Sequence, residues 1–358
     1  MKGPAYQQIH NQLRQAILSG EIPYGSKLPS APELARQFNT SAFTIQTALG
    51  PLAEVGLIER TRKKGTFVRG LPNHLASAGI YFSSDFWSGG GLDFSREVYR
   101  ELIRELAIDH VRYRTWIDSR PIKEQGEPLP EIQEAIARGE VQGIIVGKTN
   151  RIDMTWLTKT GVPSSFLTTG AVAARVGFDW REALKQGMDE LRRQGCRTVG
   201  AIVPLTPEFS QADECNQAFR DLPNIAADCG LVMKESWMPI SPTPMLEREY
   251  DAFGYHHFRE IWNQPERPDG LLVYPDVVAR GTMTAVLQAN ISIPRDIKLL
   301  FHRNEGIPFL CPLPVSWLVS NVRQVSAALI DQLRRQIEGR NVQPVRLPLA
   351  LESAICVA

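Results

Sequence analysis

The sequence predicts an α/β protein in two parts: a small N-terminal domain of short helices with one hairpin, and a larger domain built on parallel sheets. Capping signals and helical apolar spacing cover residues 4–56, and two short β-prone runs follow within residues 57–68. From residue 77 onward, short apolar runs alternate with longer amphipathic stretches, which is typical of parallel sheets covered by helices on both faces. Gly70 and Pro72 lie in a stretch without an apolar repeat, so a domain boundary is expected near residue 72.

The N-terminal domain begins with a helix predicted over residues 4–19. The residues on its apolar face are Tyr6, Ile9, Leu13, Ala16 and Ile17. A capping box at Ser30 and Glu33 starts a second helix, because each side chain can bond a backbone N–H left free at the helix end. Ser41 is the expected N-cap of a third helix, which ends at Gly56.

Gly50-Pro51 is expected to interrupt this third helix. Pro51 has no N–H to bond the carbonyl of Thr47, so the sequence predicts a kink or an early 3₁₀ turn. The second and third predicted helices are joined by a tight turn, which is the arrangement of a helix-turn-helix.

A small hairpin with a basic tip follows the third helix. Its tip carries Arg62, Lys63 and Lys64, whose repulsion destabilises the hairpin unless a polyanion such as a phosphate backbone lies close by. A helix-turn-helix followed by such a wing predicts a DNA-binding domain, with the third helix in the major groove.

The stretch from Lys27 to Val68 resembles the GntR family of bacterial transcriptional regulators. The matching residues are Leu28-Pro29-Ser30, Leu34-Ala35, Ser41, Thr44-Ile45, Ala48-Leu49, Leu52, Gly56-Leu57-Ile58 and Gly65-Thr66-Phe67-Val68. The resemblance implies a winged helix-turn-helix DNA-binding domain over residues 1–70, followed by a linker at residues 71–76. GntR-like domains usually place arginines where this chain has Pro32, Ala42 and Gln46.

Base reading is therefore expected from other side chains of the third helix. Gln46 can pair with adenine N6 and N7, and Phe43 or Thr44 can touch a thymine methyl group. The predicted DNA-contact residues are Lys27, Ser30, Arg36, Ser41, Phe43, Thr44, Gln46, Thr47, Arg60, Arg62, Lys63, Lys64 and Gly65. The alternative is that the basic residues among them form only a solvated charged face.

Charge is distributed unevenly along the 358 residues, although the net charge is only +1. Residues 1–70 contain nine Lys/Arg and four Asp/Glu, a net of +5, so the rest carries 31 against 35, a net of −4. The basic surface thus concentrates in the N-terminal domain. The polar start of the chain and the absence of an apolar run near 20 residues predict a cytoplasmic protein without a membrane partner.

The larger domain is predicted to contain about two parallel sheets. Strands are expected at Ala78–Phe82, Val111–Thr115, Gly143–Gly147, Pro163–Leu167, Val199–Val203, Val232–Ser236, Gly270–Tyr274 and Lys298–Phe301. Helices are expected at Phe94–Ile108, Ile132–Arg138, 181–194, 211–221, 248–263 and 278–289.

Segments of this domain resemble the effector domain of LacI-type regulators and their periplasmic sugar-binding relatives. The matching segments are 176–179 with the helix and strand start at 181–200, then 268–276 and 291–298. The resemblance implies a two-subdomain periplasmic-binding-protein-like domain over residues 77–358. One subdomain would hold 77–178 plus 323–338, and the other 179–320 plus 340–358. A GntR-like head on a LacI-like domain is the layout of the AraR arabinose repressors.

Ligands of open α/β sheets lie beyond the carboxyl ends of the strands, so the loops there supply the candidate residues. These are Asp85, Trp87, Trp116, Asp118, Lys148, Phe209, Arg220, Asp276 and Asn304. Aromatic faces and hydroxyl-binding carboxylates and amides suit a polyol. By the resemblance, Asp276 coincides with the family's ligand-contacting aspartate. The alternative for each residue is an ordinary loop polar group or a core aromatic, and Phe301-His302-Arg303-Asn304 departs from the family's usual Gly-Phe-Asp-Asp.

These observations predict a ligand-responsive transcriptional regulator, a repressor in the usual case, that binds operator DNA as a homodimer and senses a small molecule, most simply a carbohydrate. No catalytic arrangement, metal cluster or cofactor motif is predicted, because the His and Cys residues are scattered along the chain. Two alternatives stay open. The larger domain acts as a dimerisation or partner-protein module, or it is an enzyme fused to a DNA-binding head.

Overall fold

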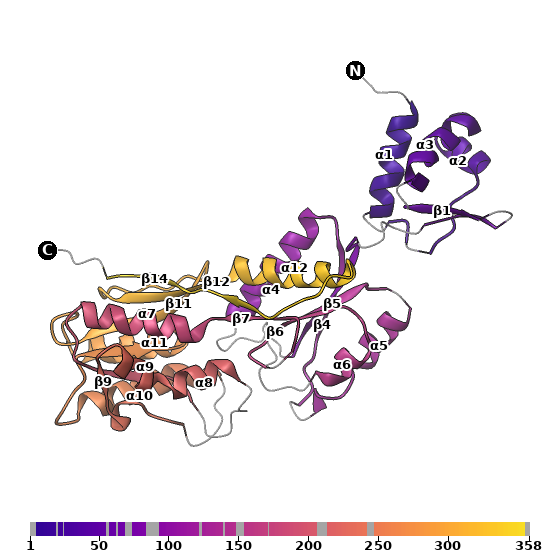
Figure 1. The fold of residues 1–358 in the computed structure, drawn as a ribbon. Helices are drawn as coiled ribbons and strands as arrows, with labels where there is room; N and C mark the ends of the chain where they lie inside the picture. The colour runs from indigo at the N-terminus through magenta and orange to yellow at the C-terminus, as the bar shows by residue number, and fades with distance from the viewer. Residues whose placement is uncertain are drawn as a thin grey trace.

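The structure, a computed structural model, describes residues 5–18, 21–23, 25–54, 57–61, 64–68, 74–83, 93–121, 124–138, 140–147, 154–170, 172–205, 213–241 and 247–354. A small N-terminal head stands beside an elongated body, and the two chain ends lie at opposite ends of the molecule (Figure 1). In the part of the chain that is described, no helix is both long and apolar enough to cross a membrane.

The head consists of a helical bundle and a two-stranded wing. Its elements are α1 (Ala5–Leu18), α2 (Ala31–Gln37), α3 (Ala42–Glu54), β1 (Ile58–Thr61) and β2 (Gly65–Val68). The strands pair antiparallel, from Ile58 opposite Val68 to Thr61 opposite Gly65. Side chains of all three helices and of both strands meet in one core, which includes Ile9, Leu13, Leu34, Ile45, Leu52 and Val68. The predicted winged helix-turn-helix is therefore confirmed.

The third helix differs from the prediction, because α3 continues as an α-helix through Pro51 to Glu54. Thr47 is exposed, so water can bond the carbonyl that Pro51 leaves without a donor. Leu49 and Leu52 are buried on the two sides of the proline and anchor the helix in the core. Packing thus outweighs one lost hydrogen bond at the exposed end of the helix, and the predicted 3₁₀ turn is wrong. The predicted helix ends at Gly20 and Gly56 lie outside the described residues.

The first sheet of the body has six strands in the order β13-β7-β6-β5-β3-β4, and all neighbouring strands are parallel. The strands are β3 (Ser77–Phe82), β4 (Arg112–Ile117), β5 (Gly143–Val146), β6 (Ser164–Leu167), β7 (Arg175–Phe178) and β13 (Val345–Leu347). Helices α4 (Asp93–Ile108) and α12 (Val322–Ile337) pack on one face. Helices α5 (Pro130–Ala137) and α6 (Thr155–Lys159) pack on the other.

The second sheet also has six strands, in the order β14-β12-β11-β10-β8-β9. The strands are β8 (Thr198–Ile202), β9 (Val232–Met233), β10 (Gly270–Val273), β11 (Lys298–Glu305), β12 (Ser316–Asn321) and β14 (Ala350–Glu352). Only β14 runs antiparallel to its neighbour. One face is covered by α7 (Trp180–Arg193), α8 (Glu214–Arg220) and α9 (Leu222–Asp228), the other by α10 (Tyr250–Trp262) and α11 (Asp276–Gln288). Two short 3₁₀ turns, η2 (Glu235–Trp237) and η3 (Glu247–Glu249), complete this subdomain. Parallel sheets covered on both faces are confirmed.

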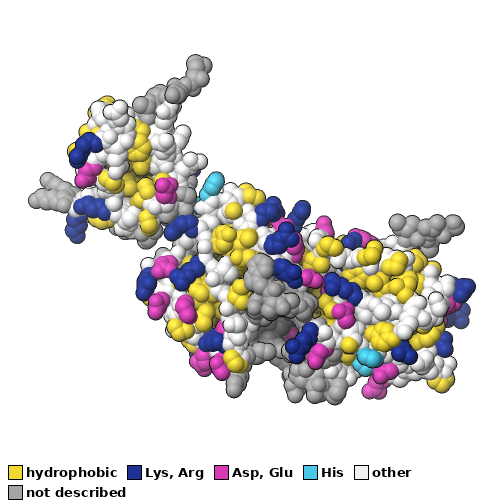
Figure 2. Space-filling model, turned by 180° about the vertical axis from the view of Figure 1, so that it is seen from behind, with side chains coloured by type: hydrophobic (Ala, Val, Ile, Leu, Met, Phe, Trp, Pro, Cys, Tyr) yellow, Lys and Arg dark blue, Asp and Glu magenta, His cyan; other side chains and the backbone are white. Residues whose placement is uncertain are grey.

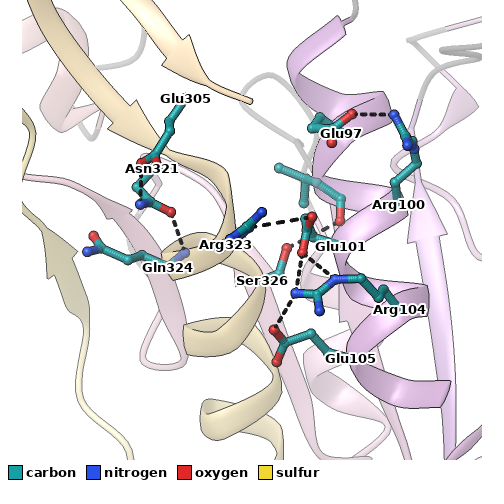
Figure 3. Close-up of polar contacts among 11 residues, drawn as sticks. Glu97, Arg100, Glu101, Arg104, Glu105, Glu305, Asn321, Arg323, Gln324 and Ser326 are labelled. Carbon is teal, nitrogen blue, oxygen red and sulfur yellow. Dashed lines mark hydrogen bonds and ion pairs between the residues drawn. The ribbon is translucent and has the colours of Figure 1, made fainter. Parts of the chain in front are cut away.

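The chain crosses between the two subdomains at three places: β7 to α7, β12 to α12, and β13 to β14. At the second crossing no loop intervenes. Asn321 ends β12 and caps α12 by accepting from Gln324 N at 3.0 Å, while its amide donates to Glu305 at 2.5 Å (Figure 3). On the α12 side, Arg323 lies 3.8 Å from Glu101 of α4, and Figure 3 shows the two helices side by side.

The third crossing corrects one expectation, namely that residues 340–358 belong wholly to the second subdomain. β13 extends the first sheet by pairing with β7, and only β14 joins the second sheet. The cause is the position of α12. This helix packs on the first sheet, so the chain that leaves its C-terminus passes the edge of that sheet before it crosses back.

Candidate functional site

The N-terminal turn of α3 forms an exposed polar and aromatic surface. Ser41 caps the helix by accepting from Thr44 N at 3.1 Å, and its hydroxyl also bonds the Thr44 hydroxyl at 2.9 Å. One turn further on, Thr47 Oγ1 donates to the Phe43 carbonyl at 3.0 Å. Phe43 itself is 80% exposed, and Gln46 is exposed beside it. Since residues at the start of a recognition helix are the ones that reach base edges, this is the candidate base-reading surface.

Basic side chains surround that surface. Arg60 of β1 donates to the Gln46 carbonyl at 3.4 Å, which brings the wing against α3. Lys27 pairs with Phe67 as an isolated bridge, and its stem lies over Gly65, where φ is +120° and any Cβ would collide with Lys27 Cε. Arg36 and Lys64 are exposed, whereas Arg62 and Lys63 lie outside the described residues. Figure 2 shows the head set apart from the body, with Lys and Arg side chains along its outline.

A second candidate site is a cavity of about 180 Å³ between the two subdomains. It lies at the carboxyl ends of β6, β8, β10 and β11, where the open-sheet rule places ligands. The first subdomain contributes Phe94, Thr168 and Phe178, among others, and the second contributes Trp180, Asp276 and Asn304. The volume is below the roughly 300–1,000 Å³ of pockets for drug-sized ligands, so the cavity suits a small molecule.

The polar end of the cavity is a hydrogen-bonded chain of three side chains. Asn304 Nδ2 donates to Asp276 Oδ2 at 3.1 Å, and Ser320 Oγ donates to Asn304 Oδ1 at 2.5 Å. All three residues are buried and line the cavity. Burial raises the pKa of Asp276, against the opposing effects of nearby Arg280 and of the Asn304 hydrogen bond. As a carboxyl group in the cavity lining, Asp276 is the candidate acceptor for a ligand hydroxyl or N–H.

The apolar end of the cavity is aromatic. The Tyr274 ring stacks on Phe219 with centroids 4.9 Å apart, and the Trp180 ring meets Tyr274 edge-on at 4.6 Å. His302 completes the cluster at 4.9 Å from Tyr274. Its ring is buried, and its Nδ1 has no hydrogen-bond partner among the described residues. Burial lowers the pKa of His302 to about 3, so the ring is neutral at physiological pH.

Ion pairs join the subdomains beside this cavity. Glu214, at the start of α8, accepts from Arg175 of β7 at 2.5 Å and from Arg346 of β13 at 2.9 Å. Its backbone N–H also donates to the Thr169 carbonyl at 3.3 Å. We refer to Glu214, Arg175 and Arg346 as the clasp. Hydrogen bonds from Arg346 lead the effects that lower the pKa of Glu214, with Arg175 adding to them, so the clasp is charged at neutral pH.

The nine predicted ligand residues fall into four groups. Asp276 and Asn304 line the cavity and contact each other, and Arg220 is an exposed residue at the end of α8, outside the lining. Asp85, Trp87, Lys148 and Phe209 lie outside the described residues. Trp116 and Asp118 are described, but the structure does not bring them to the cavity.

Trp116 and Asp118 instead take part in packing and in a buried ion pair, so the expectation that they line the ligand site is wrong. Trp116 packs in the core between the first sheet and α5. Asp118 is 2% exposed and accepts from Arg120 Nη2 at 2.7 Å and from the Tyr81 hydroxyl at 3.0 Å. Because β4 is the edge strand of its sheet, its carboxyl end lies away from the junction of the two subdomains.

Several lining residues were not predicted: Thr168, Trp180, Phe219, Tyr274, His302 and Ser320. Tyr274 and His302 had a usable signal, since each lies at or near the carboxyl end of a strand in the second sheet. Ser320 had none, because β12 was not predicted. The clasp also had no local signal, as its three members are separated by 39 and 132 positions.

Comparison with known proteins identifies both parts. Residues 5–68 match the model of bacterial regulatory proteins of the gntR family, and residues 188–352 match a periplasmic binding protein-like domain. The HTH-type transcriptional repressor NagR of Bacillus subtilis is 38% identical over 101 residues, which is 28% of this chain and 42% of that protein. An arabinose metabolism transcriptional repressor of Geobacillus stearothermophilus is 35% identical over 65 residues, 18% of each protein.

The body resembles solved structures at the level of the fold. A LacI-family regulatory protein from Chloroflexus aggregans superposes with a TM-score of 0.62 at 17% identity, over 76% of this chain and 96% of that one. The chain spans less than half the length of both curated relatives named above. The chain therefore carries a GntR-type helix-turn-helix domain at its N-terminus, followed by a periplasmic-binding-protein-like domain with the LacI-type fold.

Proposed function

We propose that this chain is a ligand-responsive, non-enzymatic transcriptional repressor that binds operator DNA as a homodimer in the cytoplasm. Residues 1–70 form its DNA-binding domain, residues 71–76 are the linker, and residues 77–358 form the effector domain. The observation that carries the proposal is the combination, in one chain, of an exposed helix-turn-helix face with a buried cavity that two subdomains share. Names of the relatives, both transcriptional repressors, support it.

DNA binding by the head rests on shape and charge. A wing and a recognition helix are present together, and exposed cations at Lys27, Arg36, Arg60 and Lys64 flank that helix. These cations would neutralise phosphates, while α3 enters the major groove. One such head contacts few base pairs, so operator specificity calls for two heads on a palindrome and hence for a homodimer.

Effector binding by the body rests on the chemistry of the cavity. Its aromatic rings can stack on the apolar face of a sugar ring, and Asp276, Asn304 and His302 offer acceptors and donors to hydroxyls. A small neutral carbohydrate is therefore the proposed ligand class. A ligand that contacts both subdomains favours the closed arrangement that the clasp holds, and coupling to DNA affinity of about 1–3 kcal/mol is typical of such switches.

The test is a thermal-shift screen of the full chain against pentoses, hexoses, sugar acids, nucleobases and amino acids. A ligand at 100 times its Kd stabilises by about 2.7 kcal/mol, which raises the Tm of the body by several degrees. A hit should then change the affinity for operator DNA, and the hit should be lost in Asp276→Asn. Shifts that persist in this variant place the ligand elsewhere. No shift with any class, together with a protein partner that binds the body, would favour a partner-binding module instead.

A further inference from the structure

We infer that the base-reading face of α3 recognises an A·T-containing half-site, through thymine methyl groups and one adenine, and makes no guanine contact. The face is defined by Phe43, Thr44, Gln46 and Thr47. This inference rests on the proposed function, since it names the chemistry of the DNA that the head would select. Its support is the hydrogen-bonding state of the four side chains.

Both threonine hydroxyls are already used within the helix. Thr44 Oγ1 bonds the Ser41 hydroxyl at 2.9 Å, and Thr47 Oγ1 donates to the Phe43 carbonyl at 3.0 Å. With its proton donated to the Phe43 carbonyl, the Thr47 hydroxyl keeps only acceptor lone pairs, which the acceptors of a guanine edge cannot use. Each threonine also offers its methyl group, and the complementary group in the major groove is the C5 methyl of thymine.

Phe43 adds the largest apolar group of this face. Its side chain is 80% exposed, whereas Ile45, Leu49 and Leu52 of the same helix are buried in the head core. Phe43 therefore contributes little to the packing of the head, and its ring faces solvent at the helix end that reaches base edges. An aromatic ring at this position gains free energy by covering thymine methyl groups, which are the only apolar groups that base edges present in the major groove.

Gln46 is the side chain of this face whose amide offers both an acceptor and a donor. It is exposed, and its side-chain amide bonds no described residue. One acceptor and one donor match adenine N6 and N7 in a bidentate pair. Guanine instead presents two acceptors, O6 and N7, which call for the paired donors of Arg or the ammonium of Lys, and the face contains neither.

Among the described residues, Arg60 is a cation bonded to α3 itself and is therefore the rival for a guanine contact. Its guanidinium donates to the Gln46 carbonyl at 3.4 Å, so it is held against the backbone of α3 from the wing. We assign it to a phosphate. Lys27 and Arg36, from the wing side and from α2, are assigned to phosphates as well.

The experiment selects binding sites from random duplex DNA with the full chain and then edits single atoms of the selected site. Uracil in place of thymine removes only the methyl group, and each contacted methyl should be worth about fourfold in Kd. Phe43→Ala should reduce the response to uracil to the part that the threonine methyl groups contribute, while Phe43→Leu should keep more of it. Replacing adenine by 7-deazaadenine should weaken binding about tenfold or more in the wild-type chain and not in Gln46→Ala. Leu310→Ala, an equally exposed apolar residue of the body, is the matched control.

Two results would overturn the inference while leaving the proposed function intact. The first is a selected half-site that tolerates uracil at every thymine. The second is a loss of affinity with 7-deazaguanine that disappears in Arg60→Ala, because it would show that Arg60 reads a guanine. If the chain selects no sequence at all, operator binding fails and this inference fails with it.

Discussion

The base-reading face of α3 and the cavity between the subdomains differ in how their polar groups are satisfied. On α3, the hydroxyls of Ser41, Thr44 and Thr47 bond within four residues of themselves, and the face is complete without a partner. In the cavity, the Asp276 carboxyl is buried with a raised pKa, and the buried His302 Nδ1 has no partner among the described residues. The head is therefore a preformed surface, whereas the cavity contains buried polar groups whose bonding a ligand can improve.

This difference has an energetic consequence. The exposed side chains of the head contribute little to the free energy of unfolding, so they can be substituted without loss of the fold. Buried groups of the cavity lower the stability of the empty protein, and a ligand that bonds them recovers that free energy as affinity.

The largest expected effect comes from the core of the head. Leu52→Ala removes a fully buried side chain, at a cost of about 2–5 kcal/mol, which should unfold the small head and abolish DNA binding. Calorimetry should still show the unfolding transition of the body, and ligand should still raise its Tm. The matched variant Leu310→Ala, at a residue that is 89% exposed, should change stability by less than about 0.5 kcal/mol. Loss of the body transition in Leu52→Ala would mean that head and body unfold as one unit.

Asp276→Asn should weaken ligand binding and raise the free energy of unfolding of the ligand-free protein. Because burial raises the pKa of Asp276, its charge opposes folding at neutral pH, and stability recovers as pH falls through the folded pKa. The amide removes that cost, while loss of the charged acceptor should weaken ligand binding by about 1.5–3 kcal/mol. Urea unfolding at pH 4 and pH 7, with calorimetric titration of the ligand, measures both effects.

Asp118→Asn is the matched control for Asp276→Asn, with the opposite sign. Burial alone would raise the pKa of Asp118, but hydrogen bonds from Arg120 and Tyr81 hold it below its ordinary value. Its charge therefore favours folding above the unfolded pKa, and this contribution is lost as pH falls through the folded one. The asparagine variant should be less stable at pH 7, with ligand affinity unchanged. Destabilisation by both substitutions would remove the proposed distinction between a ligand-binding and a structural carboxylate.

Glu214→Gln should open the cavity by weakening the clasp. Arg175 would lose its charged partner while its side chain is only 8% exposed, so ligand affinity should fall roughly threefold to tenfold. Glu214 has a lowered pKa, hence the clasp is present at neutral pH and is lost as pH falls through the folded pKa of this carboxyl. Ligand affinity should therefore drop on acidification in the wild type and less steeply in the variant.

The control for this clasp is Glu134→Gln, which removes an exposed ion pair to Arg138 within a single helix. It should leave both ligand affinity and the radius of gyration from small-angle scattering unchanged. An equal response of the two variants would show that the clasp has no special role in closure.

The head was predictable because its information is local. Ser30 and Glu33, which are three residues apart, form a capping box that predicts a helix start. The short basic run after Thr61 predicts the hairpin in which Thr61 pairs with Gly65. The predicted 3₁₀ turn at Pro51 is wrong because propensity treats each residue alone, whereas the buried Leu49 and Leu52 fix the helix through tertiary packing. In the described part of the head, the sequence could not predict that core packing outweighs the missing N–H of Pro51 in α3.

Residues of the cavity could be predicted only where the sequence shows the carboxyl end of a strand. Asp276 lies three residues after the end of β10, and Asn304 lies near the end of β11, so both were predicted and both line the cavity. Trp116 also lies at a strand end, but sequence does not say that β4 is the edge strand farthest from the crossing points. The clasp residue Glu214 and the late strands β12, β13 and β14 depend on which sheet each segment joins, and that is decided by long-range pairing.

The smallest expected effect concerns the cations of the head. It distinguishes general affinity for DNA from recognition of the base sequence. Lys64→Ala should lower the slope of log K against log salt by about 0.9 if Lys64 neutralises one phosphate, with the same loss on operator and random DNA. Lys159→Ala, an exposed lysine on the body, should leave the slope unchanged. A loss confined to operator DNA in Lys64→Ala would mean that the wing reads bases, and the α3 face would then share specificity with it.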